Sequence, residues 1–131
     1  MSPWSKIEVG WLDPTEIHQN GKYDISASAE SADVFIIKRG FPPNEYLLIE
    51  NRQPIGFDEK LPQGGILVWH IDEMANNVPG YPNQHGWPSN GNHYKVAVLQ
   101  ADRKYDLEKG NRVFEILLSL HFSICFFSLT L

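Results

Sequence analysis

Cysteine is nearly absent from this sequence, since Cys125 is the only one in 131 residues. A single cysteine excludes a disulfide within the chain, and with it a small core that depends on disulfides. It does not identify the redox compartment, because many exported domains also lack disulfides. The first residues, MSPWSKIEVGW, contain no basic region followed by an apolar run, which is the pattern of a signal peptide.

Positive charge is also scarce: 11 Lys and Arg stand against 16 Asp and Glu, and the formal net charge is −5. The basic residues form no patch or stripe along the sequence. Because binding to nucleic acid depends on gathered positive charge, we expect no nucleic-acid partner. The hydrophobic share of 42% is typical of one compact domain with a modest core.

Motifs that would carry catalysis are missing as well. No two of the five histidines stand at i and i+4 beside a glutamate, the arrangement by which a helix holds a catalytic zinc ion. There is no Gly-x-Ser-x-Gly elbow and no glycine-rich phosphate loop. Apolar neighbours of Cys125 disfavour the thiolate that a cysteine nucleophile needs. The sequence therefore predicts no catalytic residue in this chain.

The pattern that is present is that of β-strands. Alternating or β-branched runs predict strands over residues 6–12, 23–29, 34–39, 45–52, 65–71 and 93–101. The fourth and fifth runs, EYLLIENR and GILVWHI, are almost continuously apolar, which indicates burial on both faces. Residues 53–64 between them predict an ordered loop, and residues 76–92 predict a long one. We expect a mainly β fold, an antiparallel sheet or sandwich-like domain with long loops rich in Gly, Pro and Asn.

Polar residues lie inside the two strongest runs. His70 and Asp72 share one face of their strand because side chains alternate along it. If the two strands pair, Glu50 or Arg52 approaches this pair and forms a polar cluster at the end of an apolar sheet. A buried network of satisfied charges explains such a cluster more simply than a catalytic site does.

Metal sites are the remaining chemical possibility. Asp72, Asp102 and Asp106 are candidate calcium ligands, because they follow two strand ends and calcium prefers carboxylate and carbonyl oxygens. A solvated acidic surface is the alternative interpretation. His85 and His93 are a weaker candidate pair for a transition metal, since two histidines without a fixed spacing are a poor signal.

The apolar tail of residues 113–131, VFEILLSLHFSICFFSLTL, is as long as a membrane-spanning helix of ~20 residues. Its internal polar residues, and the lack of Lys or Arg beyond it, argue against a membrane span. The abrupt change of composition predicts two parts, a β-rich segment over residues 1–112 and a separate tail over residues 113–131.

Three stretches carry a likeness to a known family: GWLDPTEI, EYLLIENRQPIGFDEKLPQGGILVWHIDE and VAVLQADRKYDLEKG, in this order. They resemble the region downstream of the active site in immune-inhibitor-A-like metallopeptidases, which are mostly secreted bacterial zinc enzymes. The likeness covers residues 10–111 and implies a secreted parent enzyme that hydrolyses peptide bonds with zinc. The family's His-Glu-x-x-His motif lies upstream of the matching region, so no zinc ligand and no catalytic residue is carried over.

The resemblance implies that the chain is a fragment, a non-catalytic β-rich portion of such a peptidase. Its partners would be the upstream catalytic domain and a protein or peptide substrate. Arg103 departs from the glycine usual in the family, and the tail looks foreign to the family, as after a frameshift or a truncated gene end. The alternative is a stand-alone extracellular module that binds carbohydrate or protein through Trp69, Tyr81 and Trp87. A membrane-anchored protein is a third, less favoured interpretation.

Overall fold

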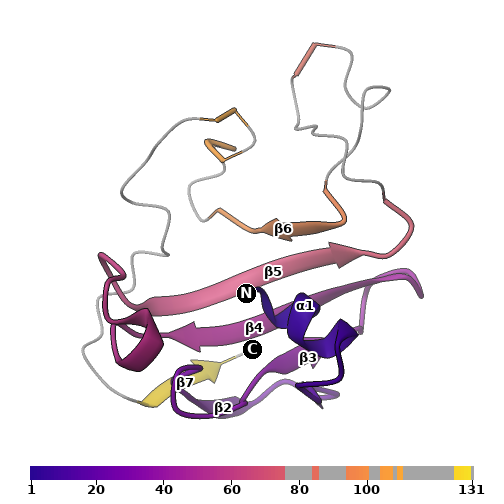
Figure 1. Ribbon diagram of the computed structural model, residues 1–131. Helices are drawn as coiled ribbons and strands as arrows, with labels where there is room; N and C mark the ends of the chain where they lie inside the picture. The colour runs from indigo at the N-terminus through magenta and orange to yellow at the C-terminus, as the bar shows by residue number, and fades with distance from the viewer. Residues whose placement is uncertain (76–83, 86–93, 101–103, 108, 111–125, 131) are drawn as a thin grey trace.

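The computed structural model describes residues 1–75, 84–85, 94–100, 104–107, 109–110 and 126–130 (Figure 1). The described part contains the helix α1 (Pro3–Glu8), the short 3-10 helix η1 (Gly56–Asp58) and seven strands. The strands are β1 (Thr15–Glu16), β2 (Lys22–Ser26), β3 (Phe35–Ile37), β4 (Glu45–Arg52), β5 (Gly65–Asp72), β6 (Val96–Val98) and β7 (Phe126–Thr130). The predicted mainly β fold is confirmed.

Five strands form one sheet in the order β1-β3-β4-β5-β6, and β2 pairs with β7 in a second sheet. All neighbours are antiparallel except β1 and β3, which are parallel, so the larger sheet is mixed rather than purely antiparallel. The reason is a crossover: the chain leaves β1, forms β2 outside the sheet and returns as β3 in the direction of β1. Parallel neighbours require such a connection.

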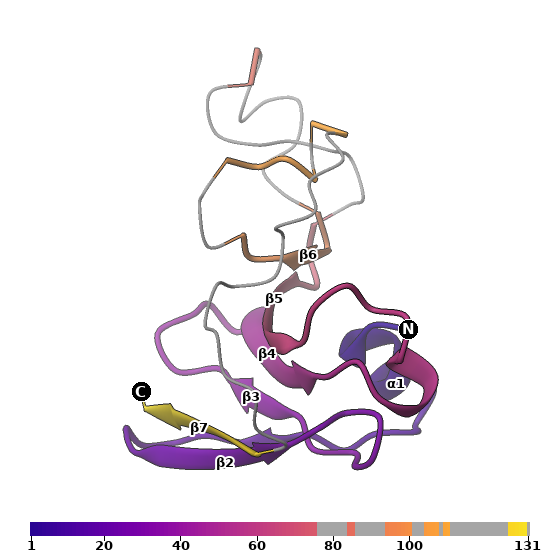
Figure 2. The same ribbon diagram turned by 90° about the vertical axis from the view of Figure 1, so that its left-hand side faces the viewer.

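The centre of the sheet is the β4–β5 hairpin, whose register runs from Glu45 opposite Asp72 to Arg52 opposite Gly65. The predicted bounds of β4 are confirmed, and β5 is one residue longer than predicted. α1 packs on one side of the sheet and β2 on the other (Figure 2). Burial of the hairpin on both faces is thereby confirmed.

We name the two sides of the hairpin by what covers them. The helix face consists of the even-numbered residues of β4 and the odd-numbered residues of β5, and the β2 face consists of the others. On the helix face the buried cluster is Leu12, Val34, Ile36, Leu48 and Ile71. On the β2 face it is Ile25, Ile49 and Ile66, with Phe35, Ile37 and Val68 packed against it.

The strand predicted over residues 6–12 is wrong, because α1 occupies its first part. Ser2 caps the helix by accepting a 3.2 Å hydrogen bond from the Ser5 amide, and Pro3 supplies a first residue with a fixed φ. At the other end Gly10, at φ 73°, donates to the Ile7 carbonyl while Trp11 donates to that of Lys6. Such caps favour a helix over an extended strand.

Asn51 of β4 links β2 and the residues after it to the larger sheet through both its side chain and its backbone. Asn51 Nδ2 donates to the Ile25 carbonyl at 3.1 Å, and the Ser28 amide donates to the Asn51 carbonyl at 2.7 Å. Residues 126–130 of the apolar tail form β7 along the other edge of β2. Residues 113–125 and 131, and most of the loop predicted over 76–92, lie outside the described residues. That the tail is separate from the family pattern stays a prediction.

Candidate functional site

His70 and Asp72, the residues that raised the question of catalysis, make structural contacts at the end of β5. His70 Nε2 lies 3.2 Å from Glu45 Oε2 on the neighbouring strand, and its ring lies 6.0 Å from that of Phe41. Asp72 Oδ1 accepts hydrogen bonds from the amides of Met74 at 2.9 Å and Ala75 at 3.2 Å. These bonds form a turn that ends the strand, as Asp side chains commonly do.

The predicted approach of Glu50 or Arg52 to His70 or Asp72 is wrong. Glu50 lies opposite Leu67 in the hairpin register, and His70 lies opposite Leu47. Glu50 and Arg52 therefore point to the helix face, whereas His70 and Asp72 point to the β2 face. The hairpin carries separate polar groups on its two faces rather than one cluster.

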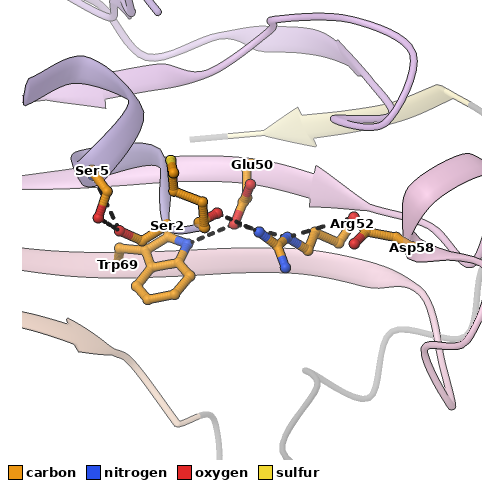
Figure 3. Close-up of polar contacts among 7 residues, drawn as sticks. Ser2, Ser5, Glu50, Arg52, Asp58 and Trp69 are labelled. Atoms are coloured by element: carbon orange, nitrogen blue, oxygen red, sulfur yellow. Dashed lines mark hydrogen bonds and ion pairs between the residues drawn. The ribbon is translucent and has the colours of Figure 1, made fainter. Parts of the chain in front are cut away.

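Glu50 is the centre of the first polar group on the helix face (Figure 3). Its side chain is fully buried and lies between Trp69 and Arg52. Glu50 Oε1 accepts a 2.9 Å hydrogen bond from Trp69 Nε1 and lies 3.3 Å from Arg52 Nε. The second contact is an ion pair by distance, but its angle does not make a hydrogen bond.

Arg52 connects this carboxylate to two further segments. Its Nη2 donates to the Met1 carbonyl at 2.7 Å, and its Nε lies 3.9 Å from Asp58 Oδ2 in η1. The guanidinium thus connects Met1, at the start of the chain, with Glu50 of β4 and with η1 in the loop after β4. A buried charge is retained in a fold when it is paired in this way, so the group fixes how these segments meet.

Glu73 is the centre of a second polar group, at the opposite end of the hairpin. Its Oε1 accepts hydrogen bonds from Trp4 Nε1 at 2.9 Å and from the Tyr46 hydroxyl at 2.7 Å. Its Oε2 lies 3.0 Å from Lys95 Nζ, and this ammonium lies 5.3 Å from the centre of the Trp4 ring. We call Trp4, Tyr46, Glu73 and Lys95 the Glu73 junction, because it joins α1, β4, the residue after β5 and the residue before β6.

The electrostatics of the Glu73 junction favour a charged carboxylate beside a neutral phenol. Burial opposes the charge of Glu73, but the hydrogen bonds from Trp4 and Tyr46 and the contact with Lys95 outweigh it, so the pKa is lowered. Burial, with the hydrogen bond and negative charge of Glu73, raises the pKa of Tyr46. Tyr46 therefore acts as a donor near neutral pH, and each donor stabilises the charge already on Glu73.

The sequence did not single out the Glu73 junction, because three of its members are far from Glu73 along the chain. Trp4 precedes Glu73 by 69 residues and Tyr46 by 27. The aromatic side chains with polar ends, Trp4 and Tyr46, were the available signal. Buried Trp and Tyr usually find an acceptor for their polar hydrogens.

The calcium site stays a prediction. Asp72 is bound in its turn, the Asp106 amide donates to Gln100 Oε1 at 2.7 Å, and Asp102 lies outside the described residues. Within those residues no group of three His, Cys, Asp or Glu side chains is arranged to hold a metal ion. His85 is exposed, and its predicted partner His93 lies outside the described residues.

The structure describes one of the three aromatic residues that were predicted to be binding platforms. Trp69 is half-buried with its indole bonded to Glu50, so it is not an exposed platform. Tyr81 and Trp87 lie outside the described residues. The structure instead exposes two aromatic residues that the sequence did not single out, Trp11 and Phe57, the former with 71% of its surface accessible.

In the described ranges no helix is long and apolar enough to cross a membrane. Comparisons of the chain with protein-family models, with curated proteins and with solved structures return no match. Membership of the metallopeptidase family therefore stays a prediction from the three motifs.

Proposed function

We propose that this chain is a non-catalytic, β-rich portion of a secreted bacterial zinc metallopeptidase, which supports the catalytic domain or helps to form its substrate groove. The three motifs support the family and the secreted location. The observation that carries the non-catalytic role is the position of His70 and Asp72, which face away from Glu50 and bind Glu45 and a turn.

In this role, the polar groups of the hairpin stabilise the positions of the segments around it. Glu50 and Glu73 each accept an indole hydrogen bond on the same face, one towards each end of the hairpin. Together they hold α1 and the neighbouring loops against β4 and β5. A rigid support of this kind suits a peptidase, because a displacement of about 1 Å at catalytic groups costs ~100-fold in rate.

The first test is hydrolysis by the chain itself. We expect no cleavage of casein by residues 1–131, with or without added zinc, because a zinc-bound water needs several protein ligands and a base beside it. Hydrolysis that depends on zinc, is lost with a chelator and survives repeated purification would overturn the proposal.

The second test is whether this chain can replace the matching region of a metallopeptidase. Residues 1–111 would replace the matching region of an immune-inhibitor-A-like metallopeptidase, and secreted protein, bound zinc and casein hydrolysis would be measured. We expect an active chimera in which His70→Ala lowers the yield of folded enzyme and leaves zinc per molecule unchanged. Loss of zinc in that variant, with folding intact, would show that His70 serves the metal centre after all.

A further inference from the structure

A cavity of about 260 Å³ lies at the edge of the larger sheet, where β1 and β3 end. Its lining residues are Ile17, Gln19, Asn20, Ile37 and Arg39. They come together because β1 and β3 are parallel, with Thr15 opposite Phe35 and Glu16 opposite Ile36. The residues that follow two parallel strands reach the same end of the sheet, so two distant segments share one cavity.

The apolar part of the cavity belongs to the folded core. Ile17 is 5% exposed, and its amide donates to the Ile36 carbonyl at 2.9 Å. Ile37 lies opposite Leu47 of β4 and packs against the buried cluster of the β2 face. The two isoleucines form a fixed apolar wall that a small branched side chain can contact.

The rest of the lining is polar and carries one positive charge. Arg39 Nη2 donates to the side-chain amide oxygen of Asn20, and the Tyr23 hydroxyl donates a 2.7 Å hydrogen bond to the Gln19 backbone carbonyl. Arg39 forms no ion pair with any of the described residues, whereas its neighbour Lys38 is paired with Glu16 at 3.2 Å. A guanidinium has five donors in a planar fork, which matches a carboxylate.

We propose that this cavity binds a small apolar group that bears a carboxylate. The carboxylate binds Arg39 and the side-chain amides of Gln19 and Asn20, and the apolar body packs on Ile17 and Ile37. The volume is below the 300–1,000 Å³ typical of sites for larger ligands, which fits a single branched side chain. This chemistry has two sources, a free short-chain carboxylic acid and the carboxyl-terminal residue of a peptide.

The test uses the full chain and two matched probes, 4-methylpentanoate and its neutral amide, followed by calorimetry and by amide NMR shifts. We expect saturable binding of the acid, with shifts confined to residues 17–20 and 37–39. The amide should bind at least about tenfold more weakly, a ratio that corresponds to ~1.4 kcal/mol. Equal binding of acid and amide, or no saturation by the acid at about 10 mM, would overturn the proposal.

Two charge variants test whether binding depends on Arg39 itself or on the net charge of the protein. Arg39→Gln should weaken binding of the acid by about tenfold or more, because it removes the charged donor. Lys38→Gln removes the same charge one residue away and should leave the affinity within about twofold. Both side chains are exposed, so both variants should keep the spectrum of the folded chain. Unchanged affinity in Arg39→Gln counts against the site.

A third comparison identifies the source of the carboxylate. The peptide acetyl-Ala-Ala-Leu is titrated with a free and with an amidated carboxyl terminus. Binding of the free peptide at least about tenfold tighter than 4-methylpentanoate assigns the cavity to peptide ends, and equal affinity assigns it to small acids. A free peptide that binds no better than its amide contradicts the proposal. These outcomes do not depend on the peptidase assignment, because none of the probes requires zinc or hydrolysis.

Discussion

The two faces of the β4–β5 hairpin hold their polar residues in different ways. On the helix face, Glu50 and Glu73 are charged groups that accept hydrogen bonds from the indoles of Trp69 and Trp4. On the β2 face, the fully buried polar residue is the neutral Asn51, which binds the backbone of β2 among isoleucines. The buried polar residue of the helix face is therefore held by charge and an indole donor, and that of the β2 face is held by backbone pairing among apolar side chains.

The largest effect should follow from removing the buried carboxylate of Glu50 from the helix face. Glu50→Ala leaves Arg52 without its buried partner, and loss of one member of a buried pair costs about 4 kcal/mol of unfolding free energy. Urea denaturation at neutral pH measures this loss. Glu50→Gln is the matched control, since its side-chain oxygen still accepts from Trp69, and it should cost less. A loss below ~1 kcal/mol in Glu50→Ala would mean that charge does not distinguish the faces.

The next effect concerns volume on the β2 face. Ile25 is fully buried, and Ile25→Ala should cost about 3 kcal/mol through lost burial and the cavity left behind. Ile25→Val removes a single methylene group and should cost ~1 kcal/mol. The two losses should be the same at neutral and mildly acidic pH, since no charge is involved. A pH-dependent loss in Ile25→Ala would show that charged groups also stabilise this face.

The sequence predicts the two faces of each strand, but it does not predict which face of β4 adjoins which face of β5. Alternation along EYLLIENR and GILVWHI predicts which residues share a face of their own strand. Which face of β4 adjoins which face of β5 depends on the register that the loop over residues 53–64 sets. Because Glu45 pairs with Asp72, even-numbered residues of β4 join odd-numbered residues of β5. A shift of the register by one residue would have brought Glu50 and His70 to the same face of the hairpin, which the predicted approach requires.

Elements outside the hairpin were harder to predict, because they form through helix caps and a chain crossover rather than through alternation of apolar residues. The alternation in KIEVGWL predicts a strand, yet Ser2 and Gly10 cap a helix over part of it. β1 is two residues long and exists because the crossover brings it beside β3. The cavity at the ends of β1 and β3 depends on that pairing, so the sequence pattern alone could not locate it.

A smaller effect should appear in acid at the Glu73 junction. The pKa of Glu73 is lowered from its usual 4.5 in the folded state, so its stabilising contribution is complete above that value. The contribution is lost as the pH falls below 4.5 through the lowered folded value. Trp4→Phe removes one donor and should cost about 1 kcal/mol at neutral pH.

The loss in Trp4→Phe should shrink at a pH well below 4.5, because protonation of Glu73 removes the interaction in both proteins. Urea denaturation at both pH values, with Glu59→Gln as an exposed control, measures the difference. A loss in Trp4→Phe that is the same at both pH values would assign the effect to packing of the ring rather than to the charge of Glu73.

The smallest effect should be the coupling between His70 and Glu45 on the β2 face. Both side chains are partly exposed, at 15% and 27%, and such pairs contribute ~0.5 kcal/mol once solvent screens them. A double-mutant cycle with His70→Gln and Glu45→Gln isolates this coupling from the packing of the imidazole on Phe41. If the pair is structural, the coupling is small and the isolated chain binds no zinc in either variant or in the native sequence. A coupling above about 2 kcal/mol would show that charge also stabilises the β2 face. Zinc that binds the native chain and is lost in His70→Gln would make the β2 face the functional one.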